Sequence, residues 1–198
     1  MNRSWLSRFC GSVPVRYKVG DQEIANRIRA GDREAASAMV HSHYAAVLRF
    51  LWMLSRNGDD AEELTQETFL RALGKMGKFR GDSGLRTWLH RIAYHAFINQ
   101  KRRRGAVSLS ADVPSGPFEA RSALALDLEC ALGGLPETAR AAFVLCEIQQ
   151  LSVKEAAEVL SVPEGTVKSR VHAARVQLRE SLATHDVRRE QQGVDHVV

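Results

Sequence analysis

Apolar residues recur every three or four positions along most of the 198-residue chain, and this spacing predicts helices. In the N-terminal part we expect a short helix capped by Asp21, a second over 32–56, a third beginning at Asp59 and Asp60, and a fourth over 85–104. No segment alternates apolar and polar residues as a half-buried strand does. The predicted class is therefore all-α.

Helical periodicity is lost over 105–120, where serine, glycine and proline concentrate, and we expect a flexible linker there. The pattern resumes near 121. The chain thus divides into two small helical domains, 19–104 and 121–183, with an N-terminal extension at 1–18. The polar tail, 184–198, is expected to fray.

The segment Ser152–Leu178 has the pattern of a helix-turn-helix. Ser152 and Glu155 have capping-box spacing, and Pro163 ends one helix and suits the start of the next. The second helix has a buried stripe and leaves small or cationic residues outside it: Thr166, Lys168, Ser169, Arg170 and Arg175. Such residues can approach base edges and phosphates. The alternative is an ordinary helical hairpin with a solvated basic face.

Charge is distributed unevenly around a net value of +5. Between Arg71 and Arg104 the one acidic residue is Asp82, whereas acidic residues gather over 59–67. A basic block beside an acidic block indicates two different partners. Cations interleave with aromatic residues over 79–104, which suits single-stranded nucleic acid, although the spacing of Trp88 equally fits a core position.

No catalytic motif accompanies these patterns: we find no phosphate-binding glycine loop, paired metal ligands or nucleophile elbow. His41 and His43 are two apart on a helix and face different ways. The three cysteines are far apart, which favours reduced thiols in a cytoplasm. No apolar run approaches the ~20 residues of a membrane helix. We expect no enzyme activity, cofactor, metal or membrane insertion, and a cytoplasmic location.

Three stretches of the first domain, Asp60–Leu70, Phe79–Ser83 and Thr87–Ala93, resemble region 2 of the extracytoplasmic-function (ECF) sigma factors. In the second domain, Ser152–Leu178, which contains Gly165–Arg170, resembles their region 4. The resemblance covers about 21–183. It implies a dissociable initiation subunit of bacterial RNA polymerase, built from two helical domains and lacking the middle domain of larger sigma factors.

The resemblance also implies three sets of site residues. The clamp helices of the largest subunit of RNA polymerase core would be contacted by Asp60, Glu62, Glu63, Leu64, Gln66 and Glu67. Bases of the melted −10 promoter element would be captured by Arg80, Gly81, Asp82, Ser83, Arg91, His95, Asn99, Lys101, Arg102 and Arg103. The −35 element would be contacted in its major groove by Pro163, Gly165, Thr166, Lys168, Ser169, Arg170 and Arg175.

Three positions depart from the family pattern. His95 stands where asparagine is common, Asn99 where aspartate is frequent, and Cys146 where a basic residue is frequent. An anti-sigma factor is a further partner that the resemblance implies. Two other hypotheses remain: a stand-alone helix-turn-helix regulator in which 21–104 dimerises or senses, and a protein-only adaptor that uses the acidic block.

Overall fold

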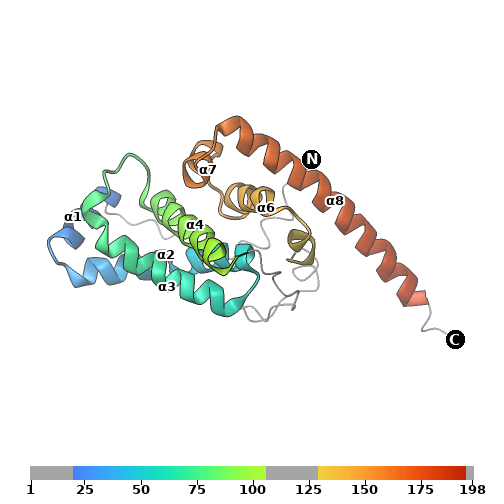
Figure 1. Ribbon diagram of the computed structural model, residues 1–198, viewed down its shortest axis with the longest axis horizontal. Coiled ribbons are helices and arrows are strands. Elements are labelled where there is room, and N and C mark those ends of the chain that lie inside the picture. Colours follow the sequence, from blue (N-terminus) through green and yellow to red (C-terminus); the bar gives the residue numbers. More distant parts are fainter. Residues whose placement is uncertain (1–19, 106–128, 195–198) are drawn as a thin grey trace.

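A computed structural model describes residues 20–105 and 129–194 of the chain, with side chains described as far as 182 (Figure 1). The regular structure of these residues is entirely helical, which confirms the all-α prediction. The expectations for 1–18, for the linker after 105 and for the start of the second domain at 121 lie outside the described residues. Among the described helices, none combines the length and apolar character that crossing a membrane requires.

The first half contains four α-helices: α1 (Asp21–Arg29), α2 (Arg33–Ser55), α3 (Gly58–Gly74) and α4 (Leu85–Arg104). A 3₁₀ turn, η2 (Met76–Lys78), lies between α3 and α4. α2 packs against both α3 and α4, which also contact each other, and α1 packs on α2. The periodic apolar residues meet at the centre of this bundle, where Phe50, Leu51 and Leu89 are fully buried.

Polar side chains at the helix ends explain where these helices start. The Asp32 carboxylate accepts the N–H groups of Glu34 and Ala35, and Asn57 accepts that of Asp60. The expectation that Asp21 caps its own helix is wrong, because Gly20 is the cap residue of α1 and makes no side-chain cap bond. Asp21 Oδ2 instead accepts the Leu85 N–H at 2.7 Å, so it caps α4 from 64 residues away.

The second half begins with a helical turn that ends at 133 and continues through α6 (Glu137–Phe143) into a π-helical turn, η3 (Val144–Ile148). The helix-turn-helix follows as α7 (Val153–Leu160) and α8 (Glu164–Val194). Both bonds of the predicted capping box are present: Ser152 Oγ accepts the Glu155 N–H, and Glu155 accepts the Ser152 N–H.

The turn between α7 and α8 also forms as predicted. Ser161 ends α7 in the left-handed conformation with φ 55°, and the Pro163 carbonyl accepts the first bonds of α8, from Thr166 and Val167. The end of α8 differs from the prediction, because the helix continues through Val194 into the tail that we expected to fray. Arginine, glutamate and glutamine favour helix there, and no proline interrupts them.

The two halves lie against each other, an arrangement that the sequence pattern did not predict. α4 packs on α7, and α2 contacts α6 and η3 (Figure 1). The buried apolar residues of both halves form one continuous cluster, from Ile24 to Leu178. α4 consequently has one face toward its own bundle and another toward the helix-turn-helix.

Candidate nucleic-acid interface

The acidic block predicted from the sequence lies on α3, where helical spacing divides it between surface and core. Glu62, Glu63 and Gln66 are exposed, and Leu70 lies on the same side of the helix with 72% of its surface exposed. We call these four residues the acidic face. Leu64 is only 1% exposed and belongs to the core of the bundle, so its side chain is not available at this surface.

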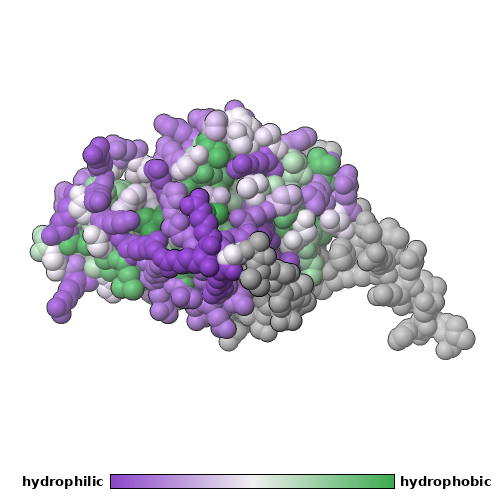
Figure 2. Space-filling model, in the orientation of Figure 1, coloured by the Kyte–Doolittle hydropathy of each residue, from purple (hydrophilic) through white to green (hydrophobic). Residues whose placement is uncertain are grey.

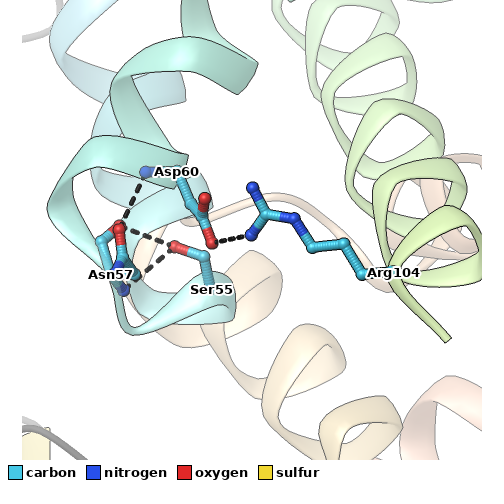
Figure 3. Close-up of polar contacts among 4 residues, drawn as sticks. All are labelled: Ser55, Asn57, Asp60 and Arg104. Carbon is cyan, nitrogen blue, oxygen red and sulfur yellow. Dashed lines mark hydrogen bonds and ion pairs between the residues drawn. The ribbon is translucent and has the colours of Figure 1, made fainter. Parts of the chain in front are cut away.

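Asp60, another residue predicted to contact polymerase, is held inside the protein by Arg104. Its carboxylate Oδ2 lies 2.6 Å from the Arg104 guanidinium, and its backbone N–H donates to Asn57 (Figure 3). Ser55 and Asn57 hydrogen-bond beside this pair. The start of α3 and the basic end of α4 are therefore joined, and Asp60 serves the packing of the first half.

The loop between η2 and α4 has a fixed base and an exposed tip. Phe79 is buried and packs against Trp88 with ring centroids 5.2 Å apart, while the Arg29 guanidinium donates to the carbonyls of Met76 and Phe79. Gly81 adopts φ 79°, a conformation that favours glycine. At the tip, the predicted residues Arg80 and Asp82 are exposed and Ser83 is half-buried.

A cavity of about 360 Å³ lies between α3, η2 and α4. Four cations line it together with an indole, an aliphatic side chain, an imidazole and an amide: Arg71, Lys75, Lys78, Arg91, Trp88, Ile92, His95 and Asn99. No acidic residue lines it, and its volume is in the range of sites for small molecules, ~300–1,000 Å³. We call it the cationic pocket.

The structure brings Arg91, His95 and Asn99, three of the residues predicted to contact the −10 element, together at the cationic pocket. It adds Arg71, Lys75 and Lys78 on the opposite wall, which sequence reasoning missed. These three residues belong to the same basic block as α4, so the charge pattern of the sequence could have predicted them. The exposed loop tip, Arg80 to Ser83, is not part of the pocket wall.

His95 is uncharged at neutral pH in this setting. Partial burial, followed by the charges of Arg91, Lys75 and Arg102, lowers the pKa of its imidazole below the ordinary value. A neutral imidazole offers one donor and one acceptor nitrogen. The pocket therefore combines positive charge for phosphates with neutral polar groups, His95 and Asn99, that can hydrogen-bond a base edge.

The opposite face of α4 is directed at the second half. Arg86 donates to the backbone carbonyl of Gln149, and Thr87 donates to the Glu155 carboxylate at 3.0 Å. His90 is 1% exposed, and its Nδ1 donates to the Arg86 carbonyl at 2.8 Å. Burial lowers the pKa of His90 to about 4, so it is neutral. Near the end of α4, Lys101 is paired with Glu137.

The beginning of α8 carries the predicted duplex-binding residues. Val167, Val171 and Leu178 form its buried stripe, and Lys168 and Ser169 lie outside it in solvent. Pro163 and Gly165 are exposed in the turn, while Thr166 and Arg170 are half-buried. Arg175 forms an ion pair with Glu147 at 2.5 Å. Cationic side chains also gather at the end of α4, where Figure 2 shows strongly hydrophilic surface at the centre of the molecule.

Other polar candidates show no reactive arrangement. Cys146 is half-buried, and burial raises the pKa of its thiol to about 11, so the thiol is protonated and inert at neutral pH. His41 is exposed and His43 half-buried, which confirms the prediction that they face different ways. In the part of the chain that the structure describes, no three histidine, cysteine, aspartate or glutamate residues group closely enough to hold a metal ion.

Comparison with known proteins decides the family. The sequence matches the models of Sigma-70 region 2 over 39–107 and Sigma-70 region 4 over 125–178. It is 34% identical over 179 residues to the ECF RNA polymerase sigma factor SigM of Mycobacterium tuberculosis, which covers 88% of this chain and 91% of SigM. The chain belongs to the ECF sigma factors. The region 2 match covers most of α2 together with α3 and α4, and the region 4 match runs from 125 into the first half of α8.

Further relatives agree with this assignment. The ECF sigma factor SigE of Mycolicibacterium smegmatis is 40% identical over 169 residues, which is 78% of this chain but 65% of SigE. Two solved structures share the fold. The sigma factor RpoE of Bartonella quintana, in complex with the anti-sigma factor NepR, has a TM-score of 0.67 at 30% identity and covers 74% of this chain and 96% of RpoE. CnrH, in complex with the cytosolic domain of CnrY, has a TM-score of 0.66 at 25% identity, over 83% and 97%.

Proposed function

We propose that this sigma factor binds the core of bacterial RNA polymerase as a dissociable subunit and directs promoter recognition, −10 melting and transcription initiation. The observation that carries the proposal is that one chain holds two different surfaces whose side chains suit nucleic acid. One is the cationic pocket between α3 and α4, and the other is the capped helix-turn-helix of α7 and α8. Family membership supports combining them in promoter recognition.

Polymerase core binds at the acidic face of α3 in this proposal. Glu62, Glu63 and Gln66 would form a polar, negatively charged rim around Leu70, the most exposed large apolar side chain among the described residues. An apolar anchor surrounded by polar groups is the usual anatomy of a specific interface. The clamp helices of the largest polymerase subunit are the proposed partner, with Leu70 taking the place that the sequence prediction gave to the buried Leu64.

The −10 element is held at the cationic pocket and the neighbouring loop tip. Flipping a base out of the duplex costs a few kcal/mol, which capture of the separated strand can offset. Arg71, Lys75 and Lys78 would hold phosphates, while His95 and Asn99 hydrogen-bond the edge of a captured base. The oxygens of the exposed Asp82 and the half-buried Ser83 can accept from base amino groups. Lys101, Arg102 and Arg103 would track the backbone beyond the pocket.

The −35 element is read in the major groove by the first turns of α8. Lys168, Ser169 and Arg170 would contact base edges and phosphates, with Pro163 and Gly165 allowing the turn to approach the backbone. One good bidentate contact gives ~1–3 kcal/mol of discrimination, whereas specific and non-specific binding differ by ~4–10 kcal/mol. One short recognition surface is therefore insufficient for specific binding. The second reader supplies the remaining free energy of discrimination, because its attachment to the same chain gives it a high effective concentration at the promoter.

A protein inhibitor is the second partner we propose. The structurally similar RpoE and CnrH were solved with an anti-sigma factor and with the cytosolic domain of CnrY, respectively.

We place the chain in the cytoplasm, where promoter DNA and polymerase lie. Polymerase, and not this chain, would form the phosphodiester bonds of the transcript. The hypothesis of a stand-alone regulator is less favoured, because it gives no function to the cationic pocket or the acidic face.

Co-elution with core polymerase tests the proposal. Wild-type chain is expected to co-elute stoichiometrically from a sizing column, and the charge reversals Glu62→Lys and Glu63→Lys should abolish co-elution without altering thermal stability. Glu23→Lys with Glu34→Lys is the matched control, because these exposed glutamates lie outside the acidic face.

Promoter affinity measured with and without core completes that test. The free chain is expected to bind promoter duplex weakly and without sequence preference, and preference should appear with core. Tight, sequence-specific duplex binding by the free chain, without core co-elution, would instead support the stand-alone regulator.

A further inference from the structure

The loop between η2 and α4 is held at both ends by α1, the first helix of the bundle. Where the loop begins, the Arg29 guanidinium donates to the Met76 carbonyl at 3.2 Å and to the Phe79 carbonyl. Where it ends, the Asp21 carboxylate accepts the Leu85 N–H at 2.7 Å. The two side chains stand at opposite ends of a nine-residue helix. α1 therefore spans the loop from its first residue to the start of α4.

α1 is itself fixed to the bundle by its apolar side. Ile24 is 6% exposed and Ala25 is fully buried, and the helix packs on α2 and contacts η2. On its polar side, Asn26 accepts from the Arg29 guanidinium at 2.6 Å and so helps to orient it. Because the helix is anchored, its polar ends are fixed points to which the loop is bonded.

The loop has few hydrogen bonds of its own. In the part of the chain that the structure describes, the backbone N–H groups of 80–84 form no hydrogen bond, although the carbonyl of Gly84 accepts from α4. Gly81 has a φ of 79°, and a β-carbon built there would come within 2.5 Å of the Gln22 side-chain oxygen. α1 thus also lies against the middle of the loop. The loop conformation depends mainly on α1 and on the packing of Phe79 against Trp88.

We propose that α1 positions the −10 site, with Asp21 and Arg29 fixing the loop tip, Asp82 and Ser83, relative to the cationic pocket. Both are positioning residues, since neither is among the residues predicted to contact DNA. The match to region 2 begins at 39 and gives α1 no such role. The inference rests on the proposed function for the identity of the bound strand, whereas the bonds between α1 and the loop are a property of the free chain.

Selectivity for a base depends on this placement more than affinity for the strand does. Hydrogen bonds to base edges need donor–acceptor distances of ~2.7–3.2 Å and weaken steeply with misalignment. Phosphate contacts carry no sequence information, and the cations of the pocket, on α3, η2 and α4, supply them without the loop. A loop released from α1 should therefore lose discrimination between bases before it loses the strand.

Amide hydrogen exchange of the free, full-length chain tests the first step. Exchange over 79–88 should be about fivefold faster in Asp21→Ala, which loses a helix cap, and about tenfold faster in Arg29→Ala, which loses bonds from a charged donor. Asp21→Asn keeps an acceptor for the same N–H and should restore slow exchange. Glu23→Ala and Arg27→Ala are the matched controls, because they remove a like charge from the same helix, and Arg27 bonds Asp32 rather than the loop.

Holoenzyme binding to −10 fork DNA tests the second step. The measured quantity is the ratio of affinities for two forks, one with the −10 block mapped by run-off transcription and one with a single base of that block changed. Asp21→Ala and Arg29→Ala should lower this ratio about five- to tenfold, while core affinity stays at the wild-type value. Asp21→Asn should restore the ratio. A variant that only destabilised the bundle would weaken core and fork binding together and leave the ratio unchanged.

Each step can fail separately. Wild-type exchange in both alanine variants would overturn the holding of the loop by α1. Faster exchange together with an unchanged affinity ratio would overturn its positioning role at the −10 site. If exchange changes as expected but wild type binds no core, α1 still holds the loop and the proposed function is what fails.

Discussion

Leu70 provides the sharpest test of the proposed polymerase surface. It is 72% exposed on α3 among polar residues, so the fold gains little from its burial. Leu70→Ala retains a good helix former and should change the free energy of unfolding by no more than ~0.5 kcal/mol. Loss of an apolar side chain from a buried interface, however, would weaken binding.

The size of the effect follows from the exposed fraction. Full burial of a leucine is worth ~1.5–3 kcal/mol, and 72% of this side chain remains to be buried, which gives about 1–2 kcal/mol. That free energy corresponds to a loss of about 5- to 30-fold in affinity for core. Equilibrium titration of labelled chain with purified core, followed by fluorescence anisotropy, measures it.

Two matched variants separate an interface effect from a stability effect. Val176→Ala removes an exposed apolar side chain, 38% exposed, from α8 and should leave core affinity unchanged. Leu64→Ala acts in the core of the bundle and should lower the free energy of unfolding by ~2–5 kcal/mol. If Leu70→Ala binds core as tightly as wild type, the acidic face is not the docking surface that we describe.

Four further predictions follow from the site geometry. His95 is neutral at pH 7.5 because its pKa is lowered in the free chain, and bound phosphates would raise that pKa. Lowering the pH to 6 should therefore protonate His95 and tighten holoenzyme binding to −10 fork DNA, and His95→Asn should flatten this dependence. The pKa of His90 is about 4 in the folded chain against an ordinary 6.5, so its contribution to the free energy of unfolding is complete above pH 6.5. Up to about 3 kcal/mol of that free energy is lost as the pH falls toward 4, and urea unfolding of wild type and His90→Gln should resolve the loss. Ser152→Ala should cost about 1 kcal/mol in urea unfolding, through loss of the capping box. Lys168→Glu with Arg170→Glu should reduce holoenzyme protection of the −35 element in footprinting, while binding of −10 fork DNA persists.

Local signals in the sequence were enough to predict the helices. Apolar spacing located them, and Asp32 and Ser152 each precede a helix with a side chain that can cap its first N–H groups. The capping box and Pro163 formed as expected, since both depend on neighbours within a few residues. The cap that Asp21 gives to α4 could not be predicted, because it depends on how α1 packs.

The site residues were predictable by type but not always by orientation. Leu64 and Leu70 are both apolar residues of α3, and only the positions of α2 and α4 decide which one is buried. Arg71 belongs to the basic block, yet its place opposite Arg91 across the pocket depends on the crossing of two helices. The Gln149 contacts could not be predicted, because Gln149 bonds Ala46, 103 residues earlier, and no periodic pattern marks a glutamine that joins two halves.

The central claim is that this chain directs polymerase core to bipartite promoters. In vitro run-off transcription from a pool of genomic fragments, with purified core and with or without the chain, tests it most directly. We predict transcripts that depend on the chain, with start sites preceded by two short sequence blocks at fixed spacing, and loss of these transcripts with Asp82→Ala and Ser83→Ala. The absence of chain-dependent start sites, or start sites that share a single block, would contradict the account.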